Sequence, residues 1–203
     1  MNKKNFLIGY KIFFALLGLS SLVTEVVILI ERGVFHLGNF ASFFTVESNV
    51  IAAVMFMISA FFLYAGKKSA RLDFFRGAAT LYMVVTGIVF ALLLSSLEGV
   101  QLTAVPWDNT VLHYIIPIAI VVDWFIDPVR KISFRKGLAW LAFPIAYLGY
   151  SLVRGVVTGW YPYPFLNPSN GGYGQIALTS LGIFALGIAL VFLVTRIGLK
   201  AKK

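Results

Sequence analysis

Six apolar stretches, each long enough to cross a bilayer as an α-helix, constrain this chain more than any other feature. A helix rises 1.5 Å per residue, so about 20 apolar residues span the hydrocarbon core. The stretches lie near residues 7–30, 42–65, 74–97, 109–126, 137–157 and 175–197. They lack strand-like alternation and are more apolar than the strands of a membrane barrel. We expect an all-α integral membrane protein, a six-transmembrane-helix bundle that forms one membrane domain over residues 1–203.

The composition supports lipid as the main solvent of the chain. Only 12% of its residues are charged, about half of what soluble proteins carry. The net charge of +9 does not indicate nucleic-acid binding, because the basic residues form short clusters between the apolar stretches. With no cysteine, disulfides and thiolate metal sites are excluded.

The distribution of lysine and arginine predicts the orientation. The N-terminus, the second and fourth connections and the C-terminus carry almost all of them: Lys3, Lys4, Lys11, Lys67, Lys68, Arg71, Arg76, Arg130, Lys131, Arg135, Lys136, Arg196, Lys200, Lys202 and Lys203. Only Arg32 and Arg154 fall on the other side. By the positive-inside rule we expect both termini in the cytoplasm and the protein in the cell membrane. The first apolar run is long and lacks a small-residue cleavage site, so we interpret it as a retained span.

Two polar residues in different spans have matching depth. Thr45 lies about one turn inside the second span, which descends from the outer face, and His113 lies about one turn inside the fourth, which also descends. Ser48 and Asn49 follow Thr45 at the spacing that places them on its helix face. Taken alone, Thr45 is more simply explained by a bond to a carbonyl one turn earlier. His113 alone fits a hydrogen-bonded core position and a proton-handling role equally well. Together they predict a shared site in the outer leaflet.

Other ionisable groups have structural explanations beside functional ones. Glu25 and Arg154 approach the layer of Thr45 and are expected either to support the site or to form an ion pair. Asp123 lies ten residues past His113, roughly 15 Å deeper, which favours an interfacial anchor facing Arg130.

Glu47 and two prolines also have structural explanations. Glu47 points to another helix face than Thr45 and would pair with Arg32 or Arg154. Pro117 and Pro144 are expected to kink their helices and to free backbone groups.

The last outer connection, residues 158–174, is the longest. Its prolines, glycines and aromatic residues predict a folded loop rather than a helix, which could cover a cavity or be an ordinary interfacial hairpin. Tyr163 in this loop is a candidate supporting residue.

Three functions fit these residues. A threonine hydroxyl becomes a nucleophile when a base such as histidine takes its proton, so Thr45 and His113 suit hydrolysis of a lipid ester through an acyl-threonine. Buried Glu25, Glu47, His113 and Asp123 would instead suit a proton-coupled transporter, although no internal repeat is visible. A non-catalytic lipid-binding role is the third. With two histidines and scattered acids, no metal site is expected.

Three phrases resemble a known family. F-F-T-V-E-S-N (residues 43–49), L-H-Y-I-I-P-I-A-I-V-V-D-W (residues 112–124) and Y-P-Y-P-F-L-N-P (residues 161–168) are similar to the Pr6Pr family of bacterial six-span membrane proteins. That family in turn resembles the eukaryotic androgen-induced (FAR-17a/AIG-like) membrane threonine hydrolases. The resemblance implies cleavage of fatty-acid esters of hydroxy fatty acids (FAHFA).

The resemblance also assigns residues. It implies Thr45 as nucleophile, His113 as its partner and Asp123 as the acid that follows. The T-G-x-x-x-Y-P-F phrase of the hydrolases corresponds to Thr158, Gly159, Tyr163, Pro164 and Phe165. The chain departs from them at Glu47, Ser48 and Asn49 and in its shorter outer loops.

The expectation for function is therefore an intramembrane hydrolase of lipid or fatty-acyl esters. Thr45 is the expected nucleophile and His113 the general base. Orientation or oxyanion contacts are expected from Ser48, Asn49, Glu25, Arg154, Tyr163 and Asp123. We expect no metal or organic cofactor, and membrane lipids as the surrounding partners.

Overall fold

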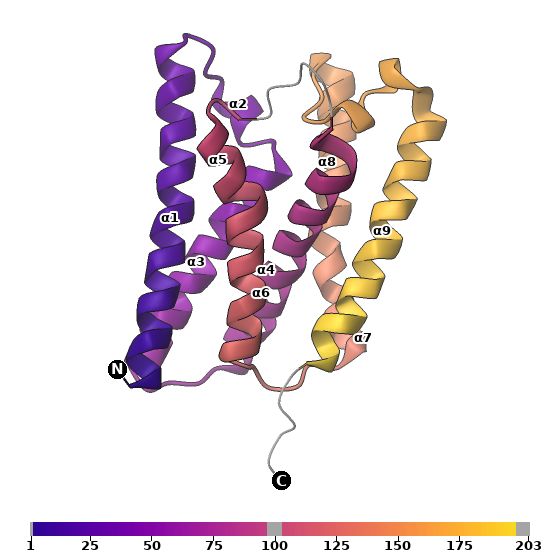
Figure 1. Cartoon of the computed structure of the whole chain (residues 1–203). Helices are drawn as coiled ribbons and strands as arrows, with labels where there is room; N and C mark the ends of the chain where they lie inside the picture. Colours follow the sequence, from indigo (N-terminus) through magenta and orange to yellow (C-terminus); the bar gives the residue numbers. More distant parts are fainter. Residues whose placement is uncertain (1, 97–102, 198–203) are drawn as a thin grey trace.

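The computed structural model describes residues 2–96 and 103–197 as long helices packed side by side (Figure 1). Within these residues six helices are long and apolar enough to cross a membrane, and no strand occurs. This confirms the predicted all-α architecture with six spans. The protein is a multi-pass membrane protein by the length and composition of these helices.

Several spans are interrupted by short changes of helix type. The spans are α1 (Lys3–Glu31); α3 (Phe44–Tyr64); α4 (Ala70–Val89) ending in the π-helical turn η1 (Phe90–Leu94); α5 (Pro106–Thr110) continued by the π-helical turn η2 (Val111–Ile115) and α6 (Ile116–Ile126); α7 (Phe134–Gly137) continued by the 3-10 turn η3 (Leu138–Leu141) and α8 (Ala142–Thr158); and α9 (Gly172–Arg196). The connections contain α2 (Leu37–Phe40) and the 3-10 turns η4 (Pro164–Leu166) and η5 (Pro168–Asn170).

Five of the six spans begin three or four residues earlier than their apolar runs, and in the two largest shifts a polar side chain caps the helix. The Asn2 side chain accepts a hydrogen bond from the Lys4 N–H, so α1 starts ahead of residue 7. The Ser69 hydroxyl accepts from the Leu72 N–H, so α4 starts ahead of residue 74. The end expected for the third span, residue 97, lies outside the described residues.

Helix α4 lies at the centre of the bundle and contacts α3, α6 and α9. One side of it, with Ala79 and Met83, packs against small residues of α1 and α3 such as Ala15 and Ala52. The other side, with Leu81, joins an aromatic-rich core that reaches α9 and the last connection. Small residues let the first helices approach closely, as is common between membrane helices.

The two ends of the bundle differ in content. The Thr45 end holds the start of α3 and the last connection, residues 159–171 (Figure 1). The Lys3 end holds the first residues of α1, the α3–α4 and α6–α7 connections and the end of α9. The first and last spans therefore have their terminal ends on the same side. Large apolar side chains face outward between the ends, with Val157 and Leu178 more than 70% exposed, as lipid contact requires.

Candidate functional site

Thr45 and His113 meet inside the Thr45 end of the bundle. Thr45 Oγ1 lies 3.2 Å from His113 Nε2, and both side chains are less than 10% exposed. Thr45 is the second residue of α3, whereas His113 is the third of η2. The structure therefore brings together the two side chains that the matching depths predicted to share a site.

The hydrogen bonds of His113 define its tautomer and its orientation. Nδ1 lies 3.2 Å from the Asn109 carbonyl oxygen, which can only accept, so Nδ1 carries the proton. In the neutral ring Nε2 then accepts the hydrogen bond from the Thr45 hydroxyl. The Phe90 ring stacks on the imidazole with 4.0 Å between centroids. His113 is thus held with an unprotonated Nε2 directed at the Thr45 hydroxyl.

A proline explains the unusual backbone that carries His113. In η2 the Ile116 N–H bonds to the Val111 carbonyl, five residues back. The next residue, Pro117, has no N–H, so the Leu112 carbonyl lacks a backbone donor in this register. Asn49 supplies one through Nδ2, at 3.2 Å. The prediction that Pro117 frees backbone groups is confirmed, although the result is a π-helical turn above the proline.

Ser48 and Asn49 hold the backbone of Thr45. The Thr45 carbonyl accepts from Asn49 Nδ2 at 2.8 Å and from Ser48 Oγ at 3.2 Å. Ser48 also bonds to the Thr86 hydroxyl on α4 at 2.8 Å. Because Asn49 reaches the Leu112 carbonyl as well, one amide ties the threonine helix to the histidine helix. These two side chains position the pair without contacting its reactive atoms.

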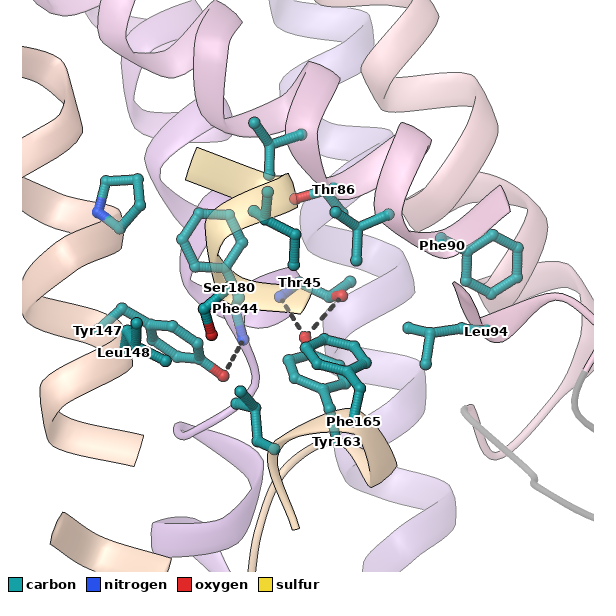
Figure 2. A pocket seen from close by; sticks show the side chains of 15 residues that line it. Phe44, Thr45, Thr86, Phe90, Leu94, Tyr147, Leu148, Tyr163, Phe165 and Ser180 are labelled. Carbon is teal, nitrogen blue, oxygen red and sulfur yellow. Dashed lines mark hydrogen bonds between the residues drawn. The ribbon is translucent and has the colours of Figure 1, made fainter. Parts of the chain in front are cut away.

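The first turn of α3 is capped by two tyrosines. The Phe44 N–H donates to the Tyr147 hydroxyl at 3.3 Å, and the Thr45 N–H donates to the Tyr163 hydroxyl at 3.2 Å (Figure 2). Both amides would otherwise lack a partner, as the first amides of every helix do. The Tyr163 oxygen also lies 3.3 Å from Thr45 Oγ1. Burial raises the pKa of Tyr163, which therefore stays a neutral hydroxyl and a donor.

The last connection is folded against α8 so that Tyr163 points inward. Gly159 ends α8 in the left-handed conformation. Tyr161 then packs its ring on Gly155, where any added Cβ would overlap that ring. Phe165 stacks on Tyr163 with 5.2 Å between centroids, and Trp160 packs edge-on against Phe43. The loop predicted for residues 158–174 covers the Thr45 site in this way, although α9 already begins at Gly172.

Two cavities meet at Thr45 and share Tyr163 and Leu94. The first, of about 90 Å³, is lined mostly by apolar side chains of α3, α4, η1, α8, α9 and the last connection, with no charged residue among the described ones that line it (Figure 2). The second, of about 210 Å³, also includes His113. Its lining adds four polar side chains: Glu25, His36, Asn39 and Thr103. Thr45 thus lies between an apolar cavity and a more polar one, and His113 lines the polar one.

The expected Glu25–Arg154 ion pair is wrong. Both Glu25 carboxylate oxygens accept from the Ala104 N–H, at 2.7 and 2.9 Å. Arg154 donates to Asn39 Oδ1 at 2.6 Å and lies over the Trp160 ring. The Glu25 carboxylate is therefore bound by a backbone N–H, whereas the Arg154 guanidinium contacts Asn39 and the Trp160 ring. Of the two residues, only Glu25 lines the polar cavity.

The pairing expected for Glu47 is also wrong. Among the described residues it forms no ion pair with Arg32 or Arg154, and its Oε2 is buried without a hydrogen-bond partner. Arg32 instead donates to the Ala104 carbonyl at 3.0 Å.

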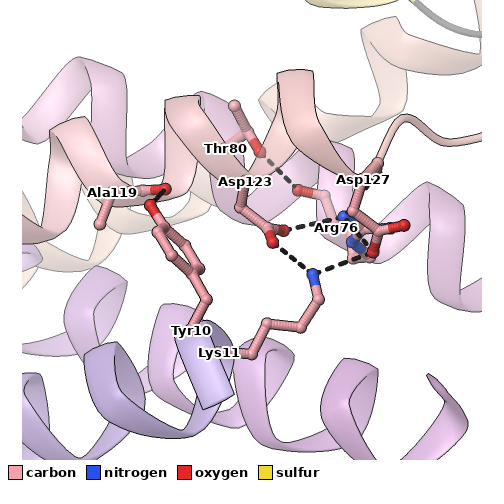
Figure 3. A network of polar contacts seen from close by, with 7 residues as sticks. All are labelled: Tyr10, Lys11, Arg76, Thr80, Ala119, Asp123 and Asp127. Carbon is pink, nitrogen blue, oxygen red and sulfur yellow. Dashed lines mark hydrogen bonds and ion pairs between the residues drawn. The ribbon is translucent and has the colours of Figure 1, made fainter. Parts of the chain in front are cut away.

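Asp123, in the last turn of α6, is part of a buried charge cluster (Figure 3). Its two oxygens bind Lys11 Nζ and, at 2.8 Å, Arg76 Nη2. Asp127 completes the cluster, 3.0 Å from Lys11 and 3.2 Å from Arg76. The expectation that Asp123 faces Arg130 is therefore wrong. It lies away from the Thr45 site, as its depth predicted, but inside the bundle.

Sequence reasoning missed three participants. Lys11 and Arg76 were used only to orient the chain, although both are buried. The signal was present for Lys11, which interrupts an apolar run at a position surrounded by large side chains. Tyr147 lies at the middle of the predicted fifth span, which distinguished it from an interfacial tyrosine, but its partner at the start of α3 could not be predicted.

Metal ligands do not cluster in the described part of the chain. Residues 2–96 and 103–197 contain no group of three or more histidine, cysteine or acidic side chains arranged to hold a metal ion.

Comparison of the chain with protein-family models, with curated proteins and with solved structures finds no match. The chemistry of the site follows from its geometry.

Proposed function

We propose that this protein is an intramembrane hydrolase of lipid or fatty-acyl esters, with Thr45 as nucleophile and His113 as general base. One observation carries the proposal: the buried Thr45 hydroxyl lies 3.2 Å from Nε2 of His113, and the other ring nitrogen, Nδ1, is already hydrogen-bonded to the Asn109 carbonyl. This is the geometry that activates a hydroxyl nucleophile, a base within hydrogen-bond reach and oriented by a third group. The phrases around Thr45, His113 and Tyr163 support membership of the Pr6Pr family, related to the androgen-induced threonine hydrolases.

His113 carries one proton in each half of the reaction, first from Thr45 to the leaving alcohol and then from water back to Thr45. His113 Nε2 takes the Thr45 proton while Oγ1 attacks the ester carbonyl carbon, and a tetrahedral oxyanion forms. Its collapse breaks the bond to the leaving alcohol, whose oxygen takes the proton from His113. The acyl group remains on Thr45. A water molecule, deprotonated by His113, then attacks the acyl-threonine and releases the fatty acid and free Thr45.

Two donors beside Thr45 fit the developing oxyanion. The Tyr163 hydroxyl lies 3.3 Å from Thr45 Oγ1, and the Thr45 N–H belongs to the first turn of α3. The start of a helix carries partial positive charge and unsatisfied N–H groups, which stabilise an anion. When substrate enters, the Tyr163 hydroxyl would donate its proton to the oxyanion, and the Thr45 N–H would donate to the oxyanion instead of to the Tyr163 oxygen.

The two cavities suggest how an ester would lie. The apolar cavity suits the acyl chain, because its walls are aliphatic and aromatic side chains. The polar cavity, which contains His113, suits the leaving alcohol, since the imidazole must reach the leaving oxygen. Fatty-acid esters of hydroxy fatty acids are the substrate class implied by the family resemblance.

A fluorophosphonate probe and an acyl 4-nitrophenyl ester test the assignment on the purified protein in detergent. Thr45→Val removes the hydroxyl while keeping the shape, and we expect loss of labelling and at least about a thousandfold slower hydrolysis. His113→Ala should slow both by about a hundredfold or more. Thr195→Val is the matched control, since Thr195 is also buried but bonds only to its own helix. Labelling that survives in Thr45→Val would exclude Thr45 as the nucleophile.

A second candidate, proton-coupled transport, is favoured by the charged cluster of Lys11, Arg76, Asp123 and Asp127 inside the bundle. Buried carboxylates in membrane proteins often carry protons. Uptake into proteoliposomes driven by a pH gradient, abolished by Asp123→Asn and unchanged by Thr45→Val, would establish transport over hydrolysis. Absence of both activities would favour a non-catalytic lipid-binding role.

A further inference from the structure

A second polar pocket lies at the Lys3 end of the bundle, the end opposite Thr45. It has a volume of about 360 Å³ and is enclosed by the start of α1, the end of α3, the start of α4 and the connection that follows α6. The Lys11–Arg76–Asp123–Asp127 cluster borders it, because Arg76 and Asp127 also line the pocket (Figure 3). The proposed hydrolytic site does not involve these residues.

The charge of this pocket is unbalanced toward positive. Its two carboxylates are already neutralised: Asp127 by Lys11 and Arg76, and Asp73 by Arg130 at 3.9 Å. Three more cations line the pocket: Lys3, Lys67 and Lys68. No described carboxylate lies within ion-pair distance of these three lysines. An anion would complete the charge balance.

A buried hydroxyl in the wall also lacks a partner. Ser59 is only 3% exposed, lines the pocket, and its Oγ bonds to none of the described residues. A buried polar group of this kind costs free energy unless something bonds to it. The start of α4, at Ser69 and Leu72, borders the same pocket and adds the positive end of a helix dipole. Both features favour an acceptor oxygen in the pocket.

The rest of the wall indicates that the ligand is amphiphilic. Phe62, Leu63 and Ile126 line the pocket together with the charged residues. Beside them Phe61 and Tyr64 are exposed by 60% and 74% on the outer surface of α3. A free inorganic ion would leave these apolar walls without contacts, whereas a lipid would place its acyl chains along them.

We propose that this pocket binds the phosphate headgroup of an anionic phospholipid. The lysines and the Ser59 hydroxyl contact the phosphate oxygens, and the acyl chains run along α3. Basic pockets between transmembrane helices are suited to anionic headgroups. The shared chemistry is a phosphate group, and the experiment separates the lipid from free phosphate.

Native mass spectrometry of the detergent-solubilised protein tests the site. We expect phosphatidylglycerol to bind at least about tenfold more tightly than phosphatidylcholine of the same chain length. The double variant Lys67→Gln/Lys68→Gln should lose this preference, since each lysine near an anionic headgroup contributes measurably. The matched control Lys131→Gln/Lys136→Gln removes the same charge at the same end of the bundle but outside the pocket, and should keep the preference. Equal loss in both variants would show a diffuse surface effect and overturn the site.

Two further arms sharpen the result. Ser59→Ala should weaken phosphatidylglycerol binding by about tenfold, as expected for a lost hydrogen bond to a charged group. Ser151→Ala, at another buried serine with an unpartnered hydroxyl, should leave it unchanged. Glycerol phosphate and inorganic phosphate are added as competitors. If either binds as tightly as phosphatidylglycerol, the pocket recognises free phosphate and the lipid assignment is overturned.

Discussion

Thr45 differs from the other buried threonines in the partner of its hydroxyl. Thr80, Thr86 and Thr195 each bond to the carbonyl four residues earlier in their own helices. Thr45 is the second residue of α3 and has no helical carbonyl one turn behind it. Its hydroxyl is therefore available for His113 and Tyr163. The general tendency of membrane threonines to bond backward thus applies to three residues and fails at the one beside a helix start.

Tyr163→Phe tests the oxyanion contact with almost no change of shape. We expect kcat for ester hydrolysis to fall by about a hundredfold, because one donor to the tetrahedral intermediate is lost. KM should change little, since the ring still lines both cavities.

Tyr147→Phe is the comparison variant for Tyr163→Phe. It also removes a hydroxyl that caps α3, but that hydroxyl bonds to the Phe44 N–H and the Ser42 carbonyl. We expect it to lower thermal stability with a much smaller effect on kcat. Equal losses of kcat in the two variants would contradict a direct role for Tyr163.

Asp123→Ala tests the buried cluster as a structural element. The change leaves Lys11 and Arg76 with one carboxylate, and we expect the free energy of unfolding in detergent to fall by about 3–5 kcal/mol. Asp73→Ala removes a carboxylate at the 3.9 Å contact to the half-exposed Arg130, which should cost less than about 1 kcal/mol. Similar denaturant midpoints for the two variants would mean that the cluster contributes little to folding.

At the residue scale, the sequence predicted the depth of the polar residues in the bundle better than it predicted their hydrogen-bond and ion-pair partners. One axial rise per residue placed Thr45 and His113 in the same layer and Asp123 in another. The rotation of each helix about its own axis could not be predicted from the sequence, and this rotation decides which side chains contact each other. Hence Glu25 and Arg154 share a layer without contact, and Asp123 faces Lys11 rather than Arg130.

At the scale of elements, the last connection depends on one close approach. Gly155→Ala would push the Tyr161 ring off α8 and displace the loop that carries Tyr163. We expect a lower melting temperature and at least about tenfold slower ester hydrolysis, despite the gain of about 1 kcal/mol in helix propensity.

Gly149→Ala is the control in the same helix, because nothing lies within 4 Å of the added Cβ. It should keep full activity and be as stable as the original protein or slightly more so. Full activity in Gly155→Ala as well would show that the packing of Tyr161 does not hold Tyr163 in place.

The spans themselves were predictable because apolar length alone specifies a membrane helix. Their internal changes of type were not. Pro117 signalled a disturbed helix, but the π register depends on Asn49, which comes from another span and supplies the missing donor. Likewise η1 contains no proline that would signal it, and the stack of its Phe90 on His113 depends on another span.

At the scale of the molecule, orientation in the membrane can be measured directly because the chain contains no cysteine. Ser169→Cys, in the last connection, should react in intact cells with a membrane-impermeant maleimide. Lys131→Cys, at the opposite end of the bundle, should react only after the membrane is opened. Both positions are exposed. The reverse pattern would place the termini outside the cytoplasm.

The Tyr163 cap of α3 also has a consequence during synthesis of the chain, because its two partners are made at different times. The amide of Thr45 receives its acceptor from a residue 118 positions later in the chain. At bacterial or eukaryotic elongation rates of about 5–20 residues per second, Tyr163 is synthesised roughly 6–24 s after Thr45 of α3. During that interval α3 is already present but its first turn is open. The Thr45 N–H therefore lacks its Tyr163 acceptor until the last connection is synthesised, and under the proposed function we expect ester hydrolysis only from a nearly complete chain.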